Sequence, residues 1–150
     1  MRHLRVWVAA PLALAVVSLF SSCNSGPRFY PVRGHVFVNG KPAEGVLVIF
    51  HPDGPDGCAV QPSGHVRADG SYELRTFLVK ERVTKDGAIA GSYRVTCTWY
   101  PEDLQKYLGN EHLPDKLRGK YADPKTTSLT AEVAEGPTEV PPFQLDAPPK

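Results

Sequence analysis

The 150-residue chain is predicted to be all-β, with its strands packed as a sandwich of two sheets. The strongest indication is residues 86–100, where a Gly-rich turn leads into a run whose side chains alternate between two faces with the period of a strand. A composition of 15 Pro, 13 Gly and one Met favours many short strands over long helices. Similar runs recur at spacings of roughly 8–12 residues with turn residues between them, which is typical of a sandwich or barrel.

The run at residues 86–100 is interpreted as the central strand of the sandwich. Its side chains fall into an apolar set and a mainly polar set, which suits a strand with one face in the core. The apolar face carries Tyr93, Val95, Cys97 and Trp99, and the other carries Arg94, Thr96, Thr98 and Tyr100.

Four strands are predicted before it. Residues 29–39 form the first, because three valines at alternating positions share one face, and Asn39-Gly40 then supplies a tight turn. Residues 46–51 (VLVIFH) are almost continuously apolar, as expected of a strand covered on both sides. Residues 65–68 and 71–77 flank Asp69-Gly70, which is a strong hairpin signal.

Two strands are predicted after it, at residues 129–134 and 139–145, which brings the count to seven. Pro141-Pro142 confines the last one to a sheet edge, because proline has no N–H to donate. Residues 79–89 are predicted to be a charged loop, and residues 101–109 one or two helical turns. An irregular segment follows, and its expected anchors on the sandwich are Leu113, Leu117 and Tyr121.

Residues 1–22 are predicted to be a signal peptide. The segment has a basic start, an apolar run over residues 6–20 and two small serines before Cys23, in the order of a secretory signal. The apolar run is shorter than the roughly 20 residues of a membrane-spanning helix. An ordinary secretory signal followed by an incidental cysteine is the simpler alternative.

The ending Ser-Ser-Cys resembles the lipobox of bacterial lipoproteins. The resemblance implies cleavage before Cys23, lipidation of that residue, and firm attachment to a membrane through several acyl chains. Residues 23–28 would be a short lipidated tether, residues 29–146 the sandwich, and residues 147–150 a tail. Asn24 at the second position of the mature chain implies an exported protein at the outer membrane or facing the periplasm.

The charge balance excludes some partners. Without the two arginines that precede Cys23, 15 Lys and Arg face 16 Asp and Glu, and the sequence shows no basic cluster. Nucleic acid is therefore not expected as a partner, because its recognition requires a basic footprint. Attraction to an anionic bilayer through protein charge alone is not expected either.

No catalytic, metal or cofactor site is predicted. The sequence contains no H-E-x-x-H pair, G-x-S-x-G elbow, Walker loop or G-x-G-x-x-G motif. Two metal sites are considered, but each has a favoured alternative: the histidines are interpreted as solvated side chains and the aspartates as turn residues. The two sites are a convergence of His35, His51 and His65, and a Ca²⁺ site built from Asp53, Asp56 and Asp69.

Cys58 and Cys97 form a candidate disulfide. They are the two cysteines that remain after Cys23 is acylated, in a compartment that permits disulfides. A bridge would close a loop of about 40 residues and add about 3–4 kcal/mol of stability in the chain-entropy model. The alternative is two thiols, with Cys97 packing as a small apolar side chain.

Aromatic residues near one end of the sandwich suggest a ligand-binding platform. Tyr100 and Tyr107 are the candidate binding residues, with glycans or peptides as ligands, in the region between Tyr100 and Tyr121. No spacing rule separates such a platform from aromatic side chains that anchor loops.

Several segments together resemble the carboxypeptidase regulatory-like domain, also called transthyretin-like or prealbumin-like, of small bacterial envelope lipoproteins. They are VRGHVFVNGKPAEGVLVIFHPDG, RADGSYELRTF, GAIAGSYRVTCTW and LPDKLRGKYADPKTTSLTAEVAEG, which lie within residues 30–146. The resemblance implies a seven-stranded Greek-key sandwich without catalytic chemistry of its own. The 5-hydroxyisourate hydrolases of the same fold end in Tyr-Arg-Gly-Ser, whereas this chain ends in LDAPPK.

The sequence thus predicts a non-catalytic, lipid-anchored cell-envelope protein whose sandwich is a structural or interaction module. Its expected partners are the membrane and an envelope protein, peptide or glycan. The alternative is a glycan- or peptide-binding module that uses the loop aromatics.

Overall fold

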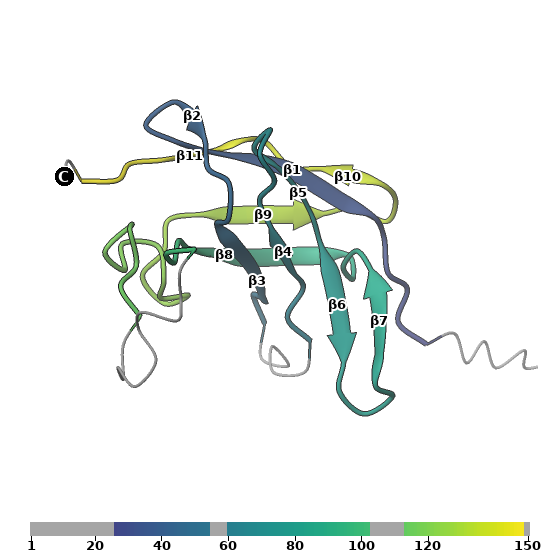
Figure 1. Cartoon of the computed structure of the whole chain (residues 1–150). Helices are drawn as coiled ribbons and strands as arrows, with labels where there is room; N and C mark the ends of the chain where they lie inside the picture. Colours follow the sequence, from purple (N-terminus) through teal and green to yellow (C-terminus); the bar gives the residue numbers. More distant parts are fainter. Residues whose placement is uncertain (1–25, 55–59, 103–112, 149–150) are drawn as a thin grey trace, which may run out of the picture.

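A computed structural model of the chain describes residues 26–54, 60–102 and 113–148. These residues contain eleven strands and no helix. The strands form two sheets, one of six strands and one of five, and the ribbon shows the two layers (Figure 1). The prediction of an all-β, two-sheet protein is confirmed.

The larger sheet has the order β7-β6-β4-β3-β8-β9, and each of its pairings is antiparallel. The longest strand is β8, which pairs with β3 from Leu47↔Thr98 to Pro52↔Tyr93. The predicted central strand is therefore internal, with β9 on its other side and at the sheet edge. The strands are β3 (Leu47–Pro52), β4 (Ser63–His65), β6 (Arg75–Leu78), β7 (Val83–Asp86), β8 (Gly91–Thr98) and β9 (Thr130–Val133).

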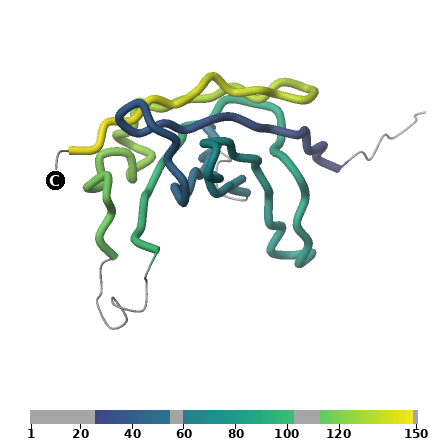
Figure 2. The backbone as a smooth tube through the Cα atoms, turned by 45° about the horizontal axis from the view of Figure 1, so that its top comes forward, coloured from purple at the N-terminus to yellow at the C-terminus, as the bar shows by residue number. Residues whose placement is uncertain are grey.

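The smaller sheet is built around β1 (Val32–Val38). On one side β1 pairs antiparallel with β2 (Lys41–Pro42) and β5 (Ser71–Glu73). On the other it pairs parallel with β10 (Thr138–Glu139) and β11 (Phe143–Leu145). Figure 2 shows this C-terminal segment in yellow, running beside β1. The predicted last strand is thus two strands, separated by Val140 and the two prolines.

One predicted strand, at residues 71–77, is divided between the two sheets. Its first part is β5 in the smaller sheet and its second is β6 in the larger one. Leu74, at the crossing, is buried, and its amide donates to the carbonyl of Val32 at 3.0 Å. The chain changes sheets here because Leu74 fills the core between the layers while its neighbours pair on either side.

Other boundaries also differ from the prediction. Residues 79–89 were expected to be a loop, but they include β7, which pairs with β6 over four residues. The strand expected at residues 65–68 lies at Ser63–His65 instead. The helical turns expected at residues 101–109 fall mostly outside the described residues. Eleven strand segments stand where seven were predicted, partly because two of the predicted strands are each divided in two.

The core lies between the sheets and confirms the predicted inward faces. The valines of β1 at positions 32, 36 and 38 are buried, as are Tyr93, Val95 and Cys97 of β8. Trp99 packs against this core from a half-buried position. Phe50 lies near the rings of both Tyr72 and Tyr93, with centroid distances of 6.4 and 5.6 Å.

The irregular segment from residue 113 to residue 129 is fixed along β8. Asp115 holds its start, since this carboxylate accepts the backbone N–H groups of Trp99, Leu117 and Gly119 at 2.8, 3.0 and 2.9 Å. Of the three predicted anchors, Leu117 and Tyr121 are buried. Leu113 is 40% exposed, so the prediction that it anchors the segment was wrong. Further along, the carbonyls of Tyr121 and Leu129 accept the N–H groups of Cys97 and Val95.

Candidate functional site

The hairpin of β6 and β7 carries three of the four large apolar side chains that are exposed among the described residues. Phe77, Val79 and Val83 are 55%, 73% and 41% exposed. The hairpin extends from the sandwich at the end of the larger sheet (Figure 1). A turn at residues 79–82 joins its strands, and Arg82 adopts the left-handed conformation there, with a φ of 54°. This concentration of exposed apolar surface makes the hairpin a candidate contact site.

Both faces of the hairpin are apolar near its tip. In the strand register Phe77 lies opposite Thr84, and Leu78 lies opposite Val83. Because side chains alternate across a strand, Phe77 belongs to one face while Leu78 and Val83 belong to the other. Val79 continues the apolar surface into the turn.

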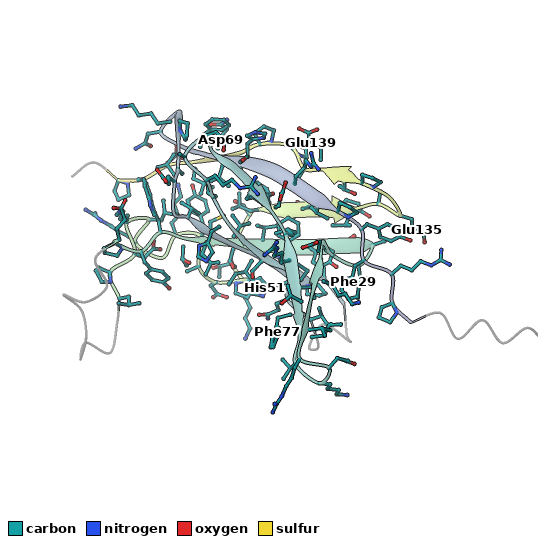
Figure 3. All side chains as sticks on the ribbon, turned by 45° about the vertical axis from the view of Figure 1, so that its right-hand side comes forward. Phe29, His51, Asp69, Phe77, Glu135 and Glu139 are labelled. Carbon is teal, nitrogen blue, oxygen red and sulfur yellow. The ribbon has the colours of Figure 1, made fainter. Side chains whose placement is uncertain are left out.

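A groove runs between the hairpin and the N-terminal segment. It has a volume of about 960 Å³ and is mainly apolar where Leu78, Val79 and Val83 face Pro27, Phe29 and Val60. Lys80, Glu81, Lys85 and Asp86 complete its wall. Figure 3 labels Phe29 and Phe77 in this part of the molecule. We call the apolar part of this groove the hairpin groove; it is formed by Pro27, Phe29, Val60, Leu78, Val79 and Val83.

Backbone hydrogen bonds hold the N-terminal segment beside the hairpin. Tyr30 and Ala88 exchange N–H···O bonds of 2.8 and 3.0 Å just beyond the end of β7. Next to Ala88 lies Gly87, whose φ is +93° and where any Cβ would overlap the Tyr30 carbonyl. The buried hydroxyl of Thr76 donates to the Gly87 carbonyl at 2.7 Å. The segment and the hairpin are therefore joined by backbone hydrogen bonds next to the end of β7.

The charges on the hairpin are unequal. Residues 75–86 include four basic side chains and two acidic ones. Arg75 pairs with Asp86 at 3.2 Å, at the end of the β6–β7 ladder that lies opposite the turn. Around the tip Lys80 and Arg82 flank Glu81, so this end of the hairpin carries a local positive charge although the chain as a whole is nearly neutral.

Most of the predicted site residues lie outside the described ranges. Cys23, Cys58 and Tyr107 are among them, so neither the lipidation nor the disulfide is tested here. Tyr100 is half-buried just after β8.

The structure does not support Tyr121 as part of an aromatic platform. Its side chain is 5% exposed, and its hydroxyl accepts the N–H of Asp146 at 3.1 Å. It is therefore an anchor of the irregular segment. The neighbouring Trp99 is covered on one side by Lys116, whose Nζ lies 4.6 Å from the ring centroid.

Cys97 is fully buried and has no disulfide partner among the described residues. Burial raises the pKa of its thiol to about 12, and the Asp115 carboxylate adds to the shift. The thiol is thus protonated at neutral pH and is a poor nucleophile or metal ligand, since both roles need the thiolate.

His51 is the histidine with the most side-chain hydrogen bonds in the described ranges. Its ring lies between Gln61 and Thr96, with Nδ1 3.3 Å from the Gln61 amide nitrogen and Nε2 2.9 Å from the Thr96 hydroxyl. With the amide donating to Nδ1, Nε2 carries the proton and donates to Thr96. Burial lowers the pKa of His51, in keeping with this neutral form.

The other candidate ligands are not brought together. His51 lies at one end of β3, opposite Arg94 of β8. His65 lies in β4, opposite Leu47 at the other end of β3, and His35 belongs to the other sheet. Within the described ranges no group of three His, Cys, Asp or Glu side chains is placed to hold a metal.

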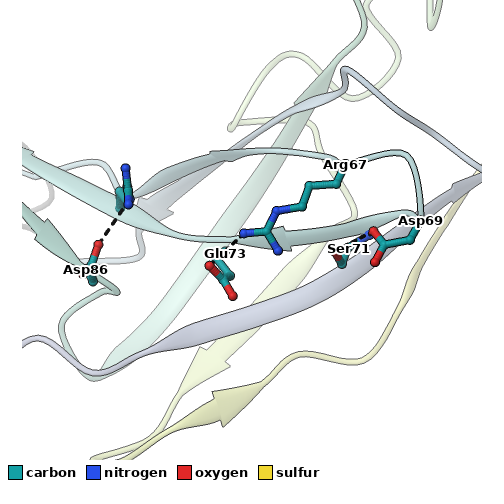
Figure 4. A network of polar contacts seen from close by, with 6 residues as sticks. Arg67, Asp69, Ser71, Glu73 and Asp86 are labelled. Atoms are coloured by element: carbon teal, nitrogen blue, oxygen red, sulfur yellow. Dashed lines mark hydrogen bonds and ion pairs between the residues drawn. The ribbon is translucent and has the colours of Figure 1, made fainter.

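Asp69, considered for calcium, instead stabilises the turn between β4 and β5. It accepts from the backbone N–H and the hydroxyl of Ser71 at 2.9 and 2.6 Å (Figure 4). These bonds lower the pKa of Asp69. Asp53 lies 3.9 Å from Arg94, and Asp56 is outside the described residues.

Sequence reasoning missed the hairpin groove because β7 was interpreted as loop. Its strand is short and all four of its residues are exposed, so no burial pattern marks it. The available signal was Phe77-Leu78-Val79 followed, after three charged residues, by Val83. Apolar side chains on both sides of a short charged segment are compatible with an exposed hairpin.

Comparisons with known proteins leave the family open. No protein-family model matches the chain, and no curated protein matches it. Among solved structures it is similar to the dioxygenase domain of a dioxygenase carbohydrate-binding protein fusion from Streptomyces sp. SirexAA-E. The identity is 17% and the TM-score 0.32, over 83% of this chain and 84% of that one.

In the part of the chain that the structure covers, no helix is long and apolar enough to cross a bilayer.

Proposed function

We propose that this chain is a non-catalytic, lipid-anchored protein of the bacterial cell envelope whose sandwich is a structural or interaction module. The observation that carries the proposal is the order of segments at the N-terminus. A basic start and an apolar run lead to a lipobox-like Ser-Ser-Cys, and Tyr30, which pairs with Ala88 of the sandwich, follows Cys23 by seven positions. That order is what an acylated cysteine followed by a short tether requires.

The finer fold assignment belongs to the same proposal. The sandwich would be a Greek-key, transthyretin-like domain of the carboxypeptidase regulatory-like type, as its Asn-Gly turn, Asp-Gly turn and Gly-x-Tyr-x-Val strand suggest. The packing of Tyr93 and Val95 into the core and the turns at residues 39–40 and 67–70 are compatible with it. A module of this kind presents loops and hairpins on a stable sandwich.

The test is the fate of Cys23 in the full-length chain. In a diderm bacterium, the unaltered protein is expected to take up a labelled fatty acid and to fractionate with the outer membrane. Cys23→Ala is expected to abolish the labelling and to release the protein from the membrane fraction. Ser25→Ala, which leaves the lipobox intact, is the control.

Two results would overturn the proposal. One is an unlabelled protein, and the other is a Cys23→Ala variant that stays in the membrane fraction. Mass spectrometry of the purified protein distinguishes an acylated mature chain from an ordinary cleaved secretory product.

A further inference from the structure

The hairpin groove is lined in part by the N-terminal segment that follows Cys23, and this constrains what the hairpin can reach. Pro27 and Phe29 line the groove, and Gly26 follows Cys23 by three positions. A fully extended chain spans at most about 3.3–3.6 Å per residue, so Gly26 lies within about 11 Å of an acylated Cys23. The Tyr30–Ala88 pairing keeps the hairpin beside that point.

We propose that the tip of the β6–β7 hairpin is a second membrane contact that rests in the headgroup region of the bilayer holding the lipid anchor. The inference rests on the proposed lipidation of Cys23. In this arrangement Phe77, Val79 and Val83 enter the boundary between headgroups and acyl chains, to a depth of about 5–10 Å as in other interfacial segments.

The distribution of apolar side chains favours a bilayer over a protein partner. A partner seated in the hairpin groove would cover Leu78 and Val83 but would leave Phe77 exposed on the opposite face. A lipid phase surrounds an inserted hairpin and covers both faces at once.

The charged side chains at the hairpin tip also favour a bilayer as the partner. Lys80 and Arg82 adjoin the apolar residues, and long basic side chains can extend from an apolar contact to lipid phosphates. Anionic headgroups attract such residues within a Debye length of the surface. The lipid anchor raises the local concentration of the hairpin at the membrane, so even a weak contact becomes populated.

The experiment places a tryptophan at the tip of the acylated full-length protein. Val79→Trp is reconstituted into vesicles of phosphatidylethanolamine and phosphatidylglycerol, with and without lipids brominated along the acyl chain. The matched control is Leu113→Trp, another exposed apolar residue, which does not line the hairpin groove. Trp99 is present in both variants and provides a common background.

We expect the emission of Val79→Trp to shift to the blue and to be quenched several-fold more strongly than that of Leu113→Trp. Adding Lys80→Gln and Arg82→Gln is expected to weaken the quenching in vesicles that contain phosphatidylglycerol. The same pair is expected to have little effect in vesicles of phosphatidylcholine alone.

The outcomes separate the two proposals. If the protein carries no acyl chain and does not bind vesicles, the proposed lipid anchor fails, and the second contact fails with it. If the acylated protein binds but both tryptophans are quenched equally, the hairpin contact is wrong and the anchor stands. If Val79→Trp is blue-shifted only in native envelopes and is not quenched by brominated lipid, the occupant is a protein, which also overturns the inference.

Discussion

At the residue scale, Gly34 of β1 packs closely against the side chain of Tyr72 of β5. The two are directly paired in the small sheet. A Cβ at position 34 would lie 2.6 Å from the Tyr72 hydroxyl oxygen and 2.8 Å from the ring carbon that bears it. The ring is fully buried between Phe50 and Phe143, so it has no room to move. A glycine is needed here for space.

Gly34→Ala is therefore expected to lower the free energy of unfolding by about 1–3 kcal/mol, as overpacking of a core does. Urea denaturation measures this change. The control is Gly136→Ala, where an added Cβ meets no atom within 4 Å. Equal stability of the two variants would show that the sheet relaxes around the new methyl group.

Tyr72→Phe provides a complementary measurement. The Tyr72 hydroxyl is buried without a hydrogen-bond partner in the part of the chain the structure covers, and burial raises its pKa. Removing an unsatisfied polar group is expected to leave stability unchanged or raise it by about 1 kcal/mol. When Tyr72→Phe is combined with Gly34→Ala, the atom closest to the added methyl group is gone, so part of the stability lost in Gly34→Ala is expected to be recovered.

His51 makes stability depend on pH. Burial lowers its pKa in the folded protein, so below the ordinary value of 6.5 the unfolded chain binds more protons than the native one. The stabilising contribution is present above pH 6.5 and is lost as pH falls through the lower, folded pKa. His51→Gln is expected to flatten the decline in unfolding free energy as the pH falls below 6.5.

Denaturation curves at several pH values test this, with His65→Gln, a change at an exposed imidazole of β4, as the control. If the pH profiles of the unaltered protein and His51→Gln are parallel, His51 is not the group responsible.

At the element scale, the segment that follows β8 depends on one carboxylate. Asp115 accepts three backbone N–H groups, one from Trp99 and two from its own turn, and thereby joins the segment to the end of β8. Hydrogen bonds to charged groups are worth more than neutral ones. The irregular segment can thus follow the sheet without being a strand.

Asp115→Ala is expected to lower the free energy of unfolding by about 2 kcal/mol, because it leaves backbone donors without their acceptor. Asp123→Ala, which removes a bond to one N–H in an exposed turn, is expected to cost less. Hydrogen exchange provides the second measurement: the amides of Trp99, Leu117 and Gly119 lose protection in Asp115→Ala. Unchanged protection of these three amides would contradict the assigned role.

The elements differ in how well the sequence predicts them. β1 and β8 were located because one face of each is buried, which imposes an alternating apolar pattern on the sequence. β3 was located by its almost continuous apolar run, although only Val48 and Phe50, on one face, are fully buried. β7 was missed because all of its residues are exposed. The division of residues 71–78 at Leu74 was missed because an alternating pattern does not show which sheet each half joins.

At the scale of the whole molecule, the proposed Cys58–Cys97 bridge would connect a loop to the core. Cys97 is fully buried, opposite Val48 on β3. Disulfide geometry requires the two Cα atoms within about 7 Å, so a bridge would bring Cys58 to the core as well. Mass spectrometry of the exported protein without reductant distinguishes the bridge from the alternative of two thiols, because a bridged chain would be two hydrogen atoms lighter and resistant to alkylation. Two alkylatable thiols under denaturing conditions would exclude the bridge.

The sequence by itself determined the all-β class, the inward faces of the main strands and the two turns at Asn39-Gly40 and Asp69-Gly70. These depend on side-chain period and local backbone preference, which neighbouring residues encode. It also carries the lipobox-like start on which the proposed anchor rests. Only the tertiary structure decided that the C-terminal segment runs parallel to β1, that the chain changes sheets at Leu74, and that Phe29 shares a groove with the β6–β7 hairpin. These arrangements join residues far apart in the chain, and their pairing is fixed by packing between sheets, which local patterns do not record.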